Sequence, residues 1–124
     1  MTEFEFNEGV LAVKAVYPET RVLEVSGTVR PLRVGPILIP TPFWGGGITR
    51  LLVLFDLSNH EQARPAGFLG DEWKLSSGGA PYNANPIYQH GEAWQGYSWT
   101  FPWPPALSVL QTIEAYLGRF DDHR

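Results

Sequence analysis

The predicted sheet is built around the stretch Ile48-Thr-Arg-Leu-Leu-Val-Leu-Phe-Asp-Leu57. Its residues from Leu51 to Phe55 are all apolar, with a run of glycines before the stretch and Ser58-Asn59 after it. A short, continuous apolar run between turn residues is typical of a strand that is buried on both faces. We therefore place this stretch at the middle of the sheet, and the flanking turn residues disfavour the alternative, a short helix.

Two runs upstream predict a hairpin. Gly9 to Tyr17 is apolar and β-prone, and Arg21 to Arg30 alternates between apolar and polar residues. The segment between them contains Pro18, which suits a turn, so the two runs are expected to form an antiparallel pair. Gly27 indicates a bulge in the second arm, because a glycine within a strand often marks one.

Shorter strands are expected on either side of the central stretch. Pro31 to Pro42 contains four prolines, which cannot donate hydrogen bonds to a sheet, so we expect an edge strand at Leu32–Val34 and not a central one. Gly67 to Gly70 and Glu72 to Leu75 predict two short strands. Ile87 to Gly96 is expected to form the partner arm of the aromatic strand that follows it.

That aromatic strand is Tyr97-Ser-Trp-Thr-Phe-Pro-Trp103, in which every odd position is a ring. Alternate side chains of a strand point to opposite faces, so the rings would share one face. Apolar residues then recur at helical spacing from Pro104 to Gly118, which predicts an amphipathic helix of about four turns with Gly118 as its C-terminal cap. This helix needs an apolar surface, and we expect the aromatic face to provide it.

The chain is therefore predicted to be a single α+β domain covering residues 1–124. The expected architecture is an antiparallel twisted sheet or small β-sandwich of five to seven strands, with one C-terminal amphipathic helix packed on it. A small β-barrel with a peripheral helix is the alternative. No internal repeat or break in composition marks a second domain.

Composition excludes several classes of protein. The chain has no cysteine, which rules out disulfides, thiolate nucleophiles and cysteine-ligated metals. Its net charge is −4 and its basic residues do not cluster, so we expect no nucleic-acid partner. No signal-peptide pattern and no apolar run of about 20 residues is present, so we expect a cytoplasmic protein without a membrane partner.

Candidates for catalysis are two histidines with nearby carboxylates, which could form an acid/base pair if buried beside the aromatic residues. The competing interpretation, which we favour, is that they are solvated loop residues. The spacing of His90-Gly-Glu92 suits two metal ligands, but the glycine suggests a turn, and we expect no metal and no cofactor. The candidates are His60 and His90, with Glu61, Asp71, Glu72 and Glu92.

Aromatic residues outside the regular strand are the better candidates for binding, because large rings anchor many interfaces and pockets. We expect a non-catalytic domain that binds another protein, of the inhibitor or immunity type, with a homodimer as a further option. The alternatives are a pocket for an apolar small molecule or a cofactor-independent enzyme, and then a carbohydrate-binding module. The binding candidates are Phe43, Trp44, Trp73, Tyr88 and Trp94.

Overall fold

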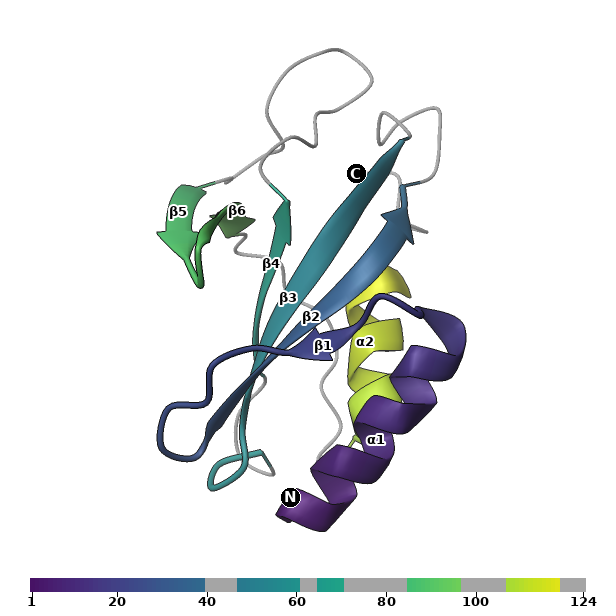
Figure 1. Ribbon diagram of the computed structural model, residues 1–124, viewed down its shortest axis with the longest axis vertical. Coiled ribbons are helices and arrows are strands. Elements are labelled where there is room, and N and C mark those ends of the chain that lie inside the picture. Colours follow the sequence, from purple (N-terminus) through teal and green to yellow (C-terminus); the bar gives the residue numbers. More distant parts are fainter. Residues whose placement is uncertain (40–46, 61–64, 71–84, 97–106, 119–124) are drawn as a thin grey trace.

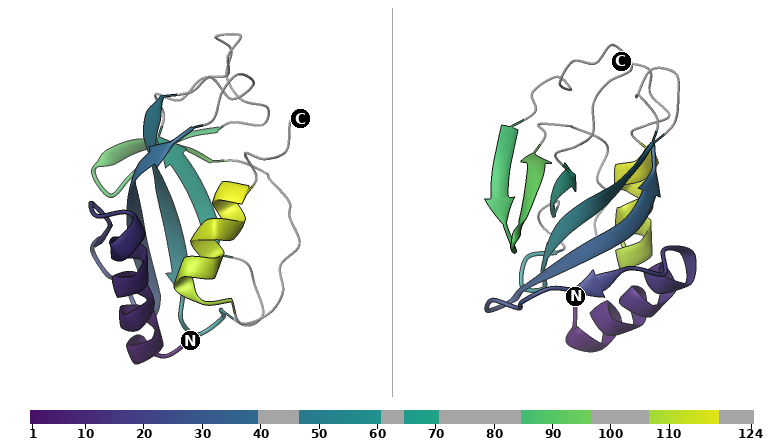
Figure 2. Two further views of the ribbon diagram at one scale, coloured as in Figure 1. Left: turned by 90° about the vertical axis from the view of Figure 1, so that its right-hand side faces the viewer. Right: turned by 45° about the horizontal axis from the view of Figure 1, so that its top comes forward.

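The computed structural model describes residues 1–39, 47–60, 65–70, 85–96 and 107–118. These residues form an α+β fold with one open, twisted antiparallel sheet and two helices (Figures 1 and 2). The strands lie in the order β1-β2-β3-β4-β6-β5. The elements are α1 Glu3–Val16, β1 Arg21–Val22, β2 Val29–Leu38, β3 Ile48–Asp56, β4 Ala66–Gly70, β5 Asn85–Gln89, β6 Glu92–Gly96 and α2 Val109–Leu117.

Strand β3 lies in the interior of the sheet, as its sequence predicts. It pairs with β2 on one side and with β4 on the other. Leu51, Leu52 and Val53 are consecutive and all buried, so both faces of the strand are covered. The prediction of a strand at Gly67–Gly70 is also confirmed, because β4 occupies these residues.

The predicted strand at Gly9–Tyr17 is wrong, because helix α1 occupies Glu3–Val16. Thr2 and Glu5 form a capping box, in which each side chain accepts a hydrogen bond from the backbone N–H of the other residue at 3.0 Å. This box satisfies two N–H groups that would otherwise lack partners at the start of a helix. Phe6, Val10 and Val13 follow at helical spacing and are buried. The β-prone valines therefore belong to one face of α1, because burial of this face outweighs the weak local propensity.

The predicted second arm, Arg21–Arg30, is also wrong as a single strand. Only Arg21 and Val22 form β1, and the chain then turns at Gly27, whose φ is 58°. Positive φ is readily adopted by glycine, so Gly27 marks a turn and not a bulge.

Strand β2 is longer than the predicted edge strand and lies between β1 and β3. Its prolines are tolerated because β1 covers only two residues, so β2 has few hydrogen bonds to lose on that side. The carbonyl of Pro31 accepts a hydrogen bond from the Leu23 N–H at 2.9 Å. The register with β3 shifts between Val34 and Ile37, where Pro36 interrupts the pairing.

The C-terminal helix begins later than predicted. α2 covers Val109–Leu117, with Ser108 as its N-cap and Gly118 as its C-cap. Val109 and Ile113 belong to the same buried cluster as the core residues of α1, β2 and β3. Of the two helices, α2 was predicted from the sequence and α1 was not.

The segment Ile87–Gly96 forms a hairpin of its own, in which β5 pairs with β6 through the turn at His90-Gly91. The sequence predicted this segment as one arm of a hairpin with the aromatic strand, whereas Ile87–Gly96 forms two arms by itself. The predicted strands Tyr97–Trp103 and Glu72–Leu75 lie outside the described residues.

Candidate functional site

A row of arginines crosses the face of the sheet opposite to the one on which the core residues Leu32 and Val34 lie. Arg21 of β1 lies directly opposite Arg33 of β2, and Arg33 lies opposite Leu52 of β3. Arg50 precedes Leu52 by two residues, so it points to the same face. Like charges on neighbouring strands repel each other. The row therefore needs a carboxylate to balance it.

Glu92 of β6 provides this carboxylate, since its side chain contacts both Arg33 of β2 and Arg50 of β3. Arg33 donates from Nε to Oε2 at 2.9 Å and from Nη2 to Oε1 at 3.1 Å. Nε of Arg50 lies 3.1 Å from the same Oε1. A paired, two-pronged contact of this kind is stronger and more directional than a single one. We call Arg33, Arg50 and Glu92 the arginine cluster.

The cluster lowers the pKa of Glu92. Hydrogen bonds from Arg33 are the largest cause, and the positive charges of Arg33, Arg50 and Arg21 add to them, whereas partial burial opposes the shift. Glu92 is therefore ionised at neutral pH. Its side chain is 26% exposed, so the pair is only partly screened by water.

Arg50 is held by two further contacts with β6. Its guanidinium carbon lies 4.7 Å from the centre of the Trp94 ring, within the range of a cation–π contact. Its Nη2 donates to the Ala93 carbonyl at 2.6 Å. Trp94 is fully buried and donates from Nε1 to the Gln89 carbonyl at 3.2 Å. The orientation of the Arg50 guanidinium is thus fixed by the protein itself.

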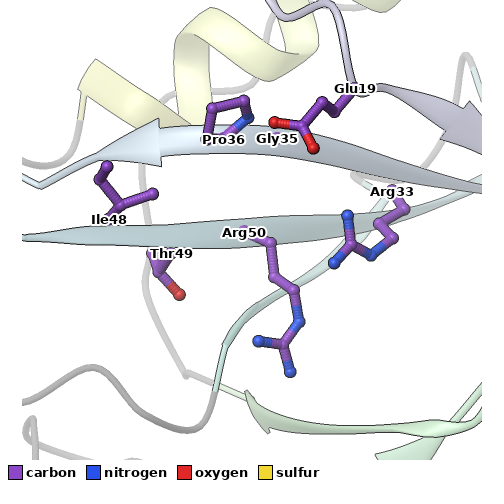
Figure 3. A pocket seen from close by; sticks show the side chains of 7 residues that line it. All are labelled: Glu19, Arg33, Gly35, Pro36, Ile48, Thr49 and Arg50. Carbon is purple, nitrogen blue, oxygen red and sulfur yellow. The ribbon is translucent and has the colours of Figure 1, made fainter.

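A pocket of about 230 Å³ adjoins the cluster. The guanidinium groups of Arg33 and Arg50 point to the same side of β2 and β3, and Glu19 lies at the edge of the pocket (Figure 3). Sites for small molecules usually enclose about 300–1,000 Å³, so this pocket suits a single side chain better than a drug-sized ligand. We call it the arginine pocket. It is lined by Glu19, Arg33, Gly35, Pro36, Ile48, Thr49 and Arg50.

Exposed aliphatic side chains border the arginine pocket. Leu38 and Ile48 form a cross-strand pair between β2 and β3, and they are 74% and 68% exposed. Pro36 is exposed as well. Exposure of these apolar side chains to water is unfavourable, so their burial against another apolar surface would be favourable. We call Pro36, Leu38 and Ile48 the aliphatic rim.

The predicted catalytic residues are not brought together within the described ranges. His60 is buried, with Nε2 2.6 Å from the Leu107 carbonyl oxygen and its ring centre 6.0 Å from that of Phe55. His90 is exposed in the β5–β6 turn, with a φ of 52°. Glu92 pairs with arginines, as described above.

The predicted binding residues fall in different environments. Tyr88 is 73% exposed on β5, where it is available to a partner. Trp94 is buried, so it supports Arg50 and presents no ring at the surface. The remaining predicted site residues lie outside the described residues: Phe43, Trp44, Glu61, Asp71, Glu72 and Trp73.

Sequence reasoning missed the role of Arg33 and Arg50. The available signal was weak: each arginine lies between two buried residues of its strand. Arg33 and Glu92 are 59 residues apart in the chain, so no local sequence pattern could predict their contact.

Among the described residues, no three of His, Cys, Asp and Glu lie close enough to hold a metal ion. Neither α1 nor α2, the helices of the described ranges, has the length and apolar character that crossing a membrane requires. Comparisons with protein-family models, curated proteins and solved structures find no significant match to this chain.

Proposed function

We propose that the chain is a non-catalytic protein-binding domain, of the inhibitor or immunity type, which binds its partner through the arginine pocket and the aliphatic rim. The observation that carries this proposal is the position of Leu38 and Ile48, an exposed aliphatic pair beside two arginines. Arginine is enriched at protein interfaces, and apolar groups dominate the fully buried centre of an interface.

The rigidity of the arginine cluster also supports the proposal. Arg50 is held by Glu92, by the Ala93 carbonyl and by the Trp94 ring before any partner arrives. Ordering a long side chain on binding costs roughly 0.5–1.5 kcal/mol, and a side chain that is already held avoids most of this cost. A cluster of this kind therefore favours recognition.

The other functions considered from the sequence have less support. His60 is buried beside the Leu107 carbonyl, whereas a general base must reach its substrate. The buried Trp94 cannot stack on a sugar. We also propose that the domain acts in the cytoplasm, and its lack of cysteine is compatible with that compartment. We also propose that α2 is packed on the sheet through Tyr116, which lies against Gly67 of β4.

The test is co-expression of the chain with proteins encoded by neighbouring genes, followed by light scattering and titration calorimetry. We expect one of them to bind with a dissociation constant below about 1 μM. Leu38→Asp and Ile48→Asp should each weaken this binding by at least about tenfold, since a charge would then be buried in the interface. Leu11→Asp is the matched control, because Leu11 is an aliphatic residue of α1 that is 61% exposed.

The proposal is overturned if no neighbour-encoded protein binds below the micromolar range. It is also overturned if Leu11→Asp weakens binding as much as Leu38→Asp does, because the rim would then have no special role.

A further inference from the structure

Helix α1 carries apolar residues on two opposite sides. One side belongs to the core and buries Phe6, Val10 and Val13. On the opposite side, residues spaced by four, three and four positions lie in line along the helix. These exposed residues, which we call the outer stripe, are Phe4, Glu8, Leu11 and Ala15. Phe4 and Leu11 are 73% and 61% exposed, so α1 presents a second apolar surface to water.

The spacing of the outer stripe is that of the a and d positions of a coiled coil, through which two helices pack against each other. Three of its four residues are apolar, namely Phe4, Leu11 and Ala15. Packing of a second helix along the stripe would remove these side chains from water, which is favourable. The surface is therefore suited to another helix.

The charges along α1 indicate how a second copy of this helix would align with it. Glu3 and Glu5 lie in the first turn and Lys14 lies in the last turn. Hydrogen bonds from Thr2 lower the pKa of Glu5, so this carboxylate is ionised at neutral pH. An antiparallel copy would bring each acidic first turn beside a basic last turn, and the opposite partial charges at the helix ends would also attract each other. A parallel copy would bring like charges together, so the antiparallel orientation is favoured.

The sizes of the stripe residues fit the same alignment. When Phe4 lies opposite Ala15 of the second copy, Ala15 lies in turn opposite Phe4 of that copy. A ring then meets a methyl group in both outer layers, and this alternation of large and small side chains allows close packing. Glu8 lies opposite Leu11 in both inner layers, which is the least favourable contact because a carboxylate is costly to bury. A second copy therefore fits the outer stripe, and Glu8 limits how tightly it binds.

The size of the surface sets the expected affinity. α1 has 14 residues, so it is about 21 Å long, and with a width of about 10 Å it offers a footprint of about 200 Å². A standard interface buries roughly 800 Å² on each partner. We therefore expect a weak dimer, with a dissociation constant of about 10–100 μM.

We propose that the outer stripe of α1 packs against the outer stripe of a second copy of the chain in antiparallel orientation and forms a weak homodimer. The outer stripe shares no residue with the arginine pocket or the aliphatic rim, so the inference does not rest on the proposed function. Dimer formation and partner binding should therefore respond to different substitutions.

Sedimentation equilibrium of the whole chain at about 5–500 μM would measure the dissociation constant of the dimer. Leu11→Asp and Ala15→Arg should each raise it by at least about tenfold, because a charge would then be buried between the helices. Glu8→Leu should lower it by roughly tenfold, because the stripe would then be apolar throughout. Val25→Asp is the matched control and should not change it, since Val25 is an aliphatic residue outside α1 that is 47% exposed.

Disulfide cross-linking would test the orientation of the two helices. The chain has no cysteine, so a single introduced cysteine reports one position of the stripe. A mixture of Phe4→Cys and Ala15→Cys chains should cross-link faster under mild oxidation than either variant alone, because the two positions lie opposite each other only in the antiparallel pair. In a parallel pair, each variant would cross-link most readily with itself.

The inference is overturned if the wild-type chain and Glu8→Leu both remain monomeric at about 500 μM. It is also overturned if neither Leu11→Asp nor Ala15→Arg weakens the dimer, or if either cysteine variant alone cross-links as fast as the mixture. These outcomes are distinct from failure of the proposed function. A monomeric chain that binds a neighbour-encoded protein retains the protein-binding role, and a dimer that binds no such protein retains the α1 interface.

Discussion

Replacing Glu92 with glutamine should destabilise the protein at neutral pH. The amide keeps the shape of the side chain and one acceptor oxygen, but it removes the charge that accepts two hydrogen bonds from Arg33 and forms an ion pair with Arg50. Hydrogen bonds to charged groups contribute about 1.5–3 kcal/mol, against about 0.5–1.5 kcal/mol for neutral ones. Because the side chain is 26% exposed, we expect a net loss of about 2 kcal/mol in the free energy of unfolding.

This loss should depend on pH in a defined direction. The arginines hold the pKa of Glu92 in the folded state below its ordinary value of 4.5, so the ionised form favours folding. A group of this kind contributes its full stability above the unfolded-state pKa and loses it as the pH falls through the folded-state pKa. The difference between wild type and Glu92→Gln should therefore be constant near neutral pH and shrink once the pH falls below 4.5.

The assay is urea unfolding, followed by far-UV circular dichroism and tryptophan fluorescence, at neutral pH and at about pH 3. Glu8→Gln is the matched control, because Glu8 is exposed on α1 away from the cluster, and it should change stability by less than about 0.5 kcal/mol. Two results would refute the reasoning: equal stability of wild type and Glu92→Gln at neutral pH, or a deficit of the same size at both pH values.

Three further substitutions test the packing of the fold by the same urea assay. Gly9→Ala should destabilise by about 2 kcal/mol although alanine favours helices by about 1 kcal/mol, because its Cβ would lie 2.6 Å from Cβ of Val109; a gain in stability would contradict the contact between α1 and α2. Gly67→Ala should cost about 1–3 kcal/mol, because its Cβ would overlap the ring of Tyr116; no loss would mean that α2 is not seated on β4. Thr2→Ala should cost about 1 kcal/mol by removing the N-cap of α1, and an unchanged unfolding midpoint would show that the capping box is not formed.

Local sequence was sufficient for the parts of the fold whose signal lies within a few residues. The apolar run of β3 is short, uninterrupted and bounded by turn residues, so its place inside the sheet could be predicted. The apolar spacing before Gly118 likewise predicted α2, although not its first residue. The signal for α1 was present in Thr2, Glu5 and the spacing of Phe6, Val10 and Val13, but the valines suggested a strand when they were considered alone.

The candidate site could not be predicted in the same way, because its parts are distant in the sequence. Its composition fixes the charges available, namely a few arginines in an acidic chain, and alternation along β2 and β3 places Arg33 and Arg50 on one face. Their partner depends on the antiparallel pairing of β4 with β6, which brings Glu92 over a strand 59 residues away. Charge and periodicity are properties of single segments, whereas the pairing of Glu92 with Arg33 exists only once the sheet has assembled and twisted.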